Sequence, residues 1–169
     1  LYNQGQNQET LEKASRLLSK YPSSVSLYNI LGATNQKLDR LDEAILAYKK
    51  AISINPNFSE AYNNIGNALQ RQGKLMKAEE AYKKAISINP DSFQAVYNLG
   101  ISLKSRGSLK KAMEAYKKAV SLNPDHAEAF YNMGIICQEQ NKTKKAIEAY
   151  RKAISIKPQY VQAHNNLGN

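Results

Sequence analysis

Residues 59–92 read SEAYNNIGNALQRQGKLMKAEEAYKKAISINPDS, and variants of this 34-residue pattern recur along the whole chain. Two residue types, proline and glycine, mark the period independently of each other. Prolines stand at positions 22, 56, 90, 124 and 158, and glycines at 32, 66, 100, 134 and 168. Aligned on the prolines, the 169 residues form one continuous array over 1–169: a half repeat 1–24, full repeats 25–58, 59–92, 93–126 and 127–160, and a truncated helix 161–169.

Each repeat is predicted to contain two helices, which in 59–92 lie at about 58–72 and 75–88. The second helix ends before Asn89-Pro90, because a residue that precedes proline is disfavoured in the α region. The next helix is expected to be capped at Asp91, with Gln94 at capping-box spacing; Asn57 with Glu60 and Asp125 with Glu128 are the equivalent pairs. One repeat position favours a left-handed turn between the two helices: Gly5, Asp39, Gly73, Gly107 and Asn141.

At 100° per residue, small and aromatic residues share one arc of each helix. Gly66 and Ala78 are expected to face each other where the helices cross, and Tyr82 to point into the core. These residues, with Tyr62 and Pro90, resemble the tetratricopeptide repeat (TPR) family, and the match extends over the whole chain. The resemblance implies an all-α fold, a right-handed superhelical solenoid of antiparallel helix pairs whose concave groove is lined by the first helices.

The positive charge follows the second helices. The chain carries 24 Lys and Arg against 14 Asp and Glu, a net charge of +10. Recurrent basic positions are predicted to point outward on the convex surface: Lys49, Lys50, Lys77, Lys83, Lys84, Lys110, Lys111, Lys117, Lys118, Lys144, Lys145, Arg151 and Lys152. A solvated face is the simpler interpretation, and a nucleic-acid or anionic-surface strip is the alternative. The recurrent tyrosines, such as Tyr82, are expected inside the core, which argues against base stacking and against nucleic acid.

Residues that could support catalysis are few. Cys137 is predicted to be a core residue, His126 a surface residue, and His164 a substitute for a core aromatic. Neither histidine has a second ligand at metal-site spacing, so we expect no enzyme activity, metal or cofactor. Glu80, Glu114 and Glu148 each precede a lysine by four residues and are expected to form helical ion pairs. No apolar run is long enough for a membrane span.

The first helices carry a different pattern, rich in asparagine. An asparagine amide offers both a donor and an acceptor, the complement of a peptide unit, so a column at repeat spacing could hold an extended backbone. The alternative is that asparagine was copied with the repeat and has no use. The motif of residues 61–67 is similar to the asparagine-ladder repeats of the O-GlcNAc transferase superhelix, which implies contact with polypeptides at Asn64, Asn98, Asn132 and Asn166. Neighbouring positions complete the candidate peptide-binding set: Asn63, Asn67, Tyr97, Tyr131, Ile101 and Ile135.

These features predict a protein–protein interaction module that binds an extended polypeptide in its concave groove. One alternative is the substrate-recruiting arm of a larger enzyme, such as a glycosyltransferase; the other is nucleic-acid or anionic-surface binding through the lysine face. The chain begins at Leu1 and ends within a repeat, so we read it as a fragment of a cytoplasmic protein. Its end repeats lack a polar cap, which predicts end-to-end self-association.

Overall fold

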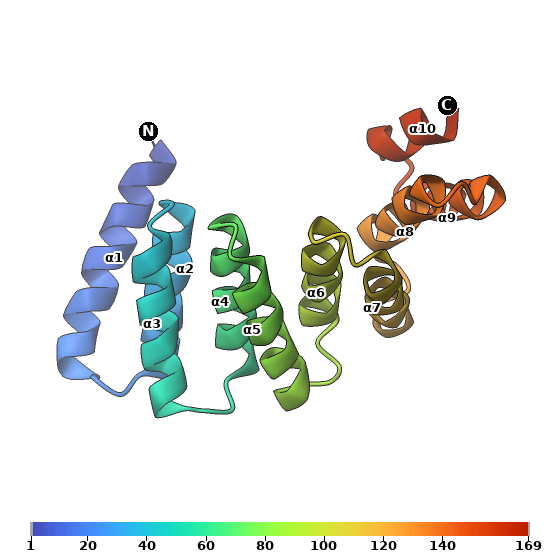
Figure 1. The fold of residues 1–169 in the computed structure, drawn as a ribbon. Helices are drawn as coiled ribbons and strands as arrows, with labels where there is room; N and C mark the ends of the chain where they lie inside the picture. Colours follow the sequence, from blue (N-terminus) through green and yellow to red (C-terminus); the bar gives the residue numbers. More distant parts are fainter. Residues whose placement is uncertain (1, 169) are drawn as a thin grey trace. The chain divides into compact units, whose positions relative to one another are not determined.

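The computed structural model describes the backbone of residues 2–168 and side chains from Gly5 to Gly168, and every regular element among them is an α-helix (Figure 1). The chain divides into two compact units, Leu1–Pro90 and Asp91–Asn169. The N-terminal unit contains α1 (Tyr2–Lys20), α2 (Val25–Lys37), α3 (Leu41–Ile54), α4 (Ser59–Arg71) and α5 (Leu75–Ile88). The C-terminal unit contains α6 (Phe93–Ser105), α7 (Leu109–Leu122), α8 (Ala127–Glu139), α9 (Thr143–Ile156) and α10 (Val161–Gly168).

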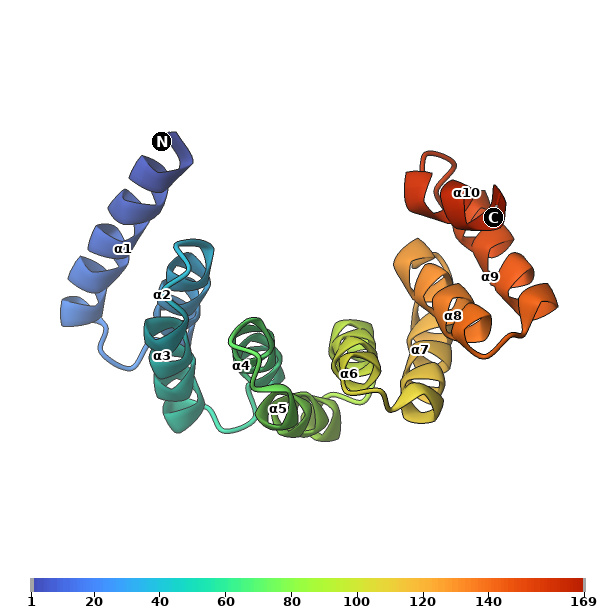
Figure 2. The same cartoon turned by 45° about the horizontal axis from the view of Figure 1, so that its top comes forward.

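Within each unit, helices that follow one another in sequence pack side by side. The pairs α2–α3 and α4–α5 form helical hairpins in the N-terminal unit, where α1 also covers α2 and α3 contacts α4 (Figures 1 and 2). The C-terminal unit repeats this arrangement with α6–α7 and α8–α9, and α10 lies against α9 (Figure 2). The predicted all-α solenoid of antiparallel helix pairs is therefore confirmed, and α4 and α5 agree with the expected helices to within one residue.

The turn inside each repeat has the left-handed backbone that its sequence predicts. The φ angle is 61° at Asp39, 73° at Gly73 and Gly107, and 56° at Asn141. Gly5 was expected to share this conformation and does not, because α1 is one continuous helix that begins at Tyr2 and passes through it.

A glycine and a tyrosine hold each helical hairpin together. Gly66 of α4 lies against the ring of Tyr82 in α5 so closely that a Cβ atom at this position would overlap the ring. Tyr82 is fully buried, and the same contact recurs in the other repeats between Gly32 and Tyr48, Gly100 and Tyr116, and Gly134 and Tyr150. Gly66 was expected to face Ala78, but the contact that requires glycine at this position is the one with the Tyr82 ring.

The predicted caps are wrong by one residue. The helices that were expected to be capped at Asn57, Asp91 and Asp125 have their N-caps at Phe58, Ser92 and His126. The side chain of Asn55 accepts a hydrogen bond from the Asn57 amide (3.1 Å), so Asn57 belongs to the turn that follows the helix and not to the start of α4. Ser92 caps α6 by accepting from the Ala95 amide (3.4 Å).

Two further expectations are corrected by the tertiary structure. His164 is exposed, and its Nε2 lies 2.9 Å from the Pro158 carbonyl oxygen, while Tyr160 fills the buried site beneath α10. Among the described residues, no ion pair joins Glu80, Glu114 or Glu148 to the lysine four positions later. The Lys152 ammonium lies instead over the Phe130 ring, 5.9 Å from its centroid. Exposed helical pairs of this kind contribute too little to hold two flexible side chains in one geometry.

Candidate functional site

The first helices of the N-terminal unit present a row of amides that is half-buried and linked from helix to helix. Asn29 of α2 donates to Glu60 of α4 through Nδ2 (3.0 Å). Asn64 donates from its Nδ2 to Asn29 Oδ1 (3.3 Å), and Asn63 donates to Asn64 Oδ1 (3.4 Å). Four side chains on two helices therefore form one polar network on the surface where the sequence predicts peptide binding. We call this surface of each unit its first-helix face.

The C-terminal unit has the same link with tyrosine in place of one amide. Asn132 of α8 donates from Nδ2 to the Tyr97 hydroxyl of α6 (3.1 Å) and to the Glu128 carbonyl oxygen (3.0 Å). Its Oδ1 accepts from Lys104 Nζ (3.2 Å). Asn166 of α10 donates to the hydroxyl of Tyr131 (3.4 Å). Both amide hydrogens of Asn132 are therefore already used inside the protein.

These bonds share one geometry, because each joins residues 35 positions apart: Asn29–Asn64, Tyr97–Asn132 and Tyr131–Asn166. An asparagine in the middle of a first helix thus bonds to the side chain that lies one position earlier in the preceding repeat. This contact gives the asparagine column a structural role in joining neighbouring helices. Asn98 of α6 and Asn67 of α4 are also half-buried and also have partners.

Aromatic rings pack against one another on the first helices of the C-terminal unit and at the ends of these helices. The ring of Tyr97 lies 4.4 Å from that of His126, and Tyr131 lies 5.0 Å from Tyr160, centroid to centroid. Burial, with the nearby Glu128 charge adding to it, raises the pKa of Tyr97 to about 12, so its hydroxyl stays neutral at physiological pH. Ile101 and Ile135, from the predicted set, are half-buried on the same helices.

His126 has a role that the sequence analysis missed. Its Nδ1 accepts from the Ala129 amide (3.2 Å) and caps α8, and its ring packs between α6 and α8. Glu128 approaches it to 3.9 Å and accepts from Lys157 Nζ (3.0 Å). Burial raises the pKa of Glu128, but the hydrogen bond and the charge of Lys157 hold it below its ordinary value. Alignment of the repeats could have revealed this cap, because His126 occupies the same repeat position as Ser92, which caps α6.

A second missed feature connects the core to this face. The buried tyrosine of a hairpin donates its hydroxyl to a glutamine twelve residues earlier, as Tyr48 does to Gln36 (3.1 Å) and Tyr150 to Gln138 (2.7 Å). Tyr82 donates to Gln70 (3.2 Å) and Asn67 (2.8 Å). In the hairpin of α6 and α7 the equivalent residue is Lys104, and the buried Tyr116 hydroxyl has no partner among the described residues. The recurrence of glutamine and tyrosine at this spacing is the signal that reveals the bond.

A metal site has no comparable cluster of side chains in the part of the chain that the structure describes. There, no three His, Cys, Asp or Glu side chains gather where they could hold a metal ion. No helix in that part is both long enough and apolar enough to cross a membrane.

Family models match the sequence of the segments that form these hairpins. Models described as tetratricopeptide repeat match residues 59–92 and 127–160, and 81–114; a model described as TPR repeat matches 37–73 and 102–141. The chain belongs to the tetratricopeptide repeat family. TPR chains of this kind are scaffolds for protein interaction, and the matches at 59–92 and 127–160 have the repeat boundaries that the prolines predict.

Solved structures similar to this TPR chain share its fold over most of their length. A crystal structure of MamA is 25% identical, with 94% of this chain and 92% of that chain covered and a TM-score of 0.83. A second crystal structure of MamA protein is 32% identical, covering 85% and 79% with a TM-score of 0.77. MamA 41-end from Desulfovibrio magneticus RS-1 is 20% identical, covering 92% and 88% with a TM-score of 0.82, and shows the fold alone. No curated protein matches the sequence.

Proposed function

We propose that the first-helix face of each unit binds an extended segment of a partner polypeptide. The observation that supports this proposal is the composition of the face, where half-buried amides alternate with half-buried aromatic and aliphatic side chains. Such a surface offers polar groups for a peptide backbone and apolar area for its side chains. The recurrent lysines lie elsewhere, on the exposed surface of the second helices.

The internal hydrogen bonds set the expected affinity. A bound backbone would replace bonds such as Asn64–Asn29 rather than meet free amides, so each new bond adds less than the roughly 1 kcal/mol of an ordinary one. Binding through amides alone is therefore expected to be weaker than micromolar, which corresponds to about −8 kcal/mol. Tighter binding requires apolar contacts, which Tyr97, Tyr131, Ile101 and Ile135 can supply.

The test compares two amides of the first-helix face with an amide outside it. Peptides selected from an array on the wild-type chain are titrated calorimetrically against the double variant Asn64→Ala/Asn166→Ala, whose substitutions lie one in each unit. Asn57→Ala is the matched control, because Asn57 is exposed in the turn before α4. We expect the double variant to lose binding, the control to retain it, and affinity to change little with salt. Equal binding by all three proteins, with unchanged circular dichroism, would contradict the proposal.

The lysine surface remains an alternative site for nucleic acid or an anionic surface. Its side chains are exposed on the second helices, as predicted. Binding there would weaken steeply with salt, because it depends on counterion release, and would survive the asparagine substitutions. A role as the recruiting arm of a larger enzyme is tested by reading the full-length open reading frame.

A further inference from the structure

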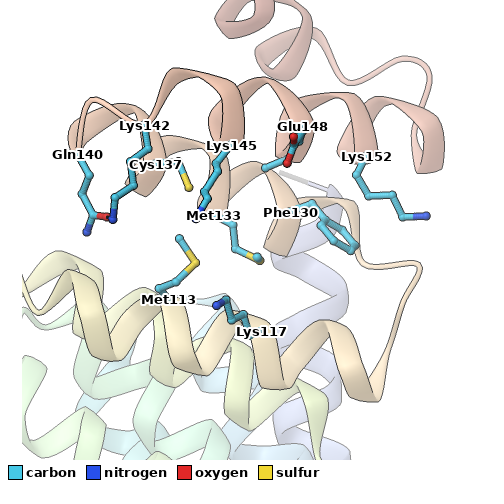
Figure 3. Close-up of a pocket in the computed structure, with 11 residues that line it drawn as sticks. Met113, Lys117, Phe130, Met133, Cys137, Gln140, Lys142, Lys145, Glu148 and Lys152 are labelled. Atoms are coloured by element: carbon cyan, nitrogen blue, oxygen red, sulfur yellow. The ribbon is translucent and has the colours of Figure 1, made fainter.

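A cavity of about 460 Å³ opens between α7, α8 and α9 of the C-terminal unit (Figure 3). Its floor is apolar and comes from two helices: Met113 of α7 and Phe130, Met133 and Cys137 of α8. Its rim is basic, with Lys117 on α7 and with Lys142, Lys145 and Lys152 at or on α9. Figure 3 shows Met113 of α7 and Met133 of α8 entering the same space, with Lys117 at its α7 edge and Lys145 pointing toward it from α9.

The sequence explains why the floor has room. In the N-terminal unit the residues 68 positions earlier are Leu69 in place of Cys137, and Ile65 in place of Met133. Cysteine is smaller than leucine and leaves space above α8. Methionine is unbranched and flexible, so it adapts to an irregular partner surface. A volume of this size is within the range of ordinary ligand pockets.

The rim carries charge that the described residues do not neutralise. Glu148 is the single carboxylate among the lining residues, against four lysines. It forms no ion pair with any of them in the described part of the chain. Lys142 donates to Gln140 Oε1 (2.7 Å), a neutral partner, and Lys152 lies over the Phe130 ring. Several ammonium groups around an apolar floor favour a ligand that is anionic at its edges and apolar at its centre.

We propose that this cavity docks an acidic, amphipathic segment of a partner protein. The segment places apolar side chains on Met113, Met133 and Cys137, and carboxylates beside Lys117 and Lys145. Lys142 and Lys152 are ten residues apart, about 15 Å along a helix, so one compact anion cannot reach the whole rim. Carboxylates on successive turns of a peptide helix can reach it. None of the residues that line the cavity belongs to the set proposed to bind peptide on the first-helix face, so the cavity gives the chain a second docking surface.

The test uses a defined probe and the chain's single cysteine. The probe is a fluorescein-labelled peptide of about twelve residues, three helical turns, with leucine on one face and glutamate on the other. Binding is followed by fluorescence anisotropy, and occupancy by the slow rate at which maleimide labels Cys137, a residue that is 7% exposed and lines the cavity. The glutamine counterpart of the probe tests the need for charge. A poly(U) RNA and vesicles of anionic phospholipid test the other polyanions.

The chain supplies matched variants. Lys117→Gln/Lys145→Gln removes two rim charges, and Lys49→Gln/Lys77→Gln removes the equivalent charges 68 residues earlier in the N-terminal unit. We expect the rim double variant to weaken probe binding by about tenfold and the matched control to change it less than about twofold. Cys137→Leu fills the floor with the residue found at the equivalent position and should weaken binding with an unchanged circular dichroism spectrum.

The proposal predicts that the probe slows maleimide labelling of Cys137 and that its glutamine counterpart does not. It is overturned if both double variants weaken binding equally, if labelling is unaffected by bound probe, or if the probe does not bind. Tighter, Lys117- and Lys145-dependent binding of RNA or vesicles would overturn it in favour of those partners. The variant Asn64→Ala/Asn166→Ala should bind the probe normally. Failure of the cavity proposal can therefore be distinguished from failure of the proposal for the first-helix face.

Discussion

The unpartnered hydroxyl of Tyr116 predicts an unusual substitution series. Tyr82 and Tyr116 are both fully buried, and both rings pack against a glycine of the preceding helix. Their hydroxyls differ, because Tyr82 donates to Asn67 and Gln70 whereas Tyr116 has no partner among the described residues. Replacing each tyrosine by phenylalanine keeps the ring and removes only the hydroxyl, so the difference between the two variants reports the hydrogen bonds.

The expected magnitudes follow from the cost of leaving a buried polar group unpaired. Tyr82→Phe should lower the free energy of unfolding by about 1 kcal/mol, the net contribution of an ordinary hydrogen bond. Tyr116→Phe should leave it unchanged or raise it by about 1 kcal/mol, because an unsatisfied buried group costs roughly 1–3 kcal/mol. Lys104→Gln supplies the acceptor found in the other hairpins and loses one half-exposed bond to Asn132, so a net gain of about 1 kcal/mol is expected.

Urea denaturation followed by circular dichroism at 222 nm measures all three variants, with the midpoint compared at constant m-value. Combining Lys104→Gln with Tyr116→Phe provides the control, because the glutamine should give no gain once the hydroxyl is absent. If Tyr116→Phe destabilises the chain as much as Tyr82→Phe, the Tyr116 hydroxyl has a partner and the reasoning fails. If Lys104→Gln stabilises equally with and without the hydroxyl, its effect has another cause.

Three further outcomes are expected. Gly66→Ala should destabilise the chain by about 1–3 kcal/mol in thermal melts, because its Cβ overlaps the Tyr82 ring, whereas Gly5→Ala in the open part of α1 should stabilise it by roughly 0.5–1 kcal/mol. Burial raises the pKa of Tyr48 from 10.0 to about 12. The stability that the neutral hydroxyl contributes is therefore complete below pH 10 and is lost as the pH rises from 10 to 12. The urea midpoint should fall over this pH range. End-to-end association should bury Val161, which is 62% exposed on α10. Sedimentation velocity should therefore show oligomers of the wild-type chain at high concentration and none of the Val161→Glu variant. A wild-type chain that stays monomeric at every concentration would contradict this prediction.

Much of the fold could be predicted from the sequence because its signals are local. The helix ends depend on residues within one turn of each other, so Asn89 before Pro90 and a left-handed residue at Gly73 were sufficient to place α4 and α5 to within one residue. The burial of Tyr82 follows from helical periodicity alone. The caps were misplaced by one residue, as at α4, where Asn57 was expected and Phe58 is observed. The geometry of the preceding turn decides which residue starts the helix, and the preference of asparagine for the cap position does not.

The candidate site depended on contacts between residues about 35 positions apart, which no local pattern contains. The sequence placed Asn64 and Asn132 on the first-helix face, but only the packing of one repeat on the next shows that their amides bond to Asn29 and Tyr97. The same holds for the unpaired Tyr116 hydroxyl and for the space above Cys137. Repeat position determines which way a side chain points. The rotation and spacing of neighbouring helices determine what it meets, and these emerge only when the cores of successive repeats are packed together.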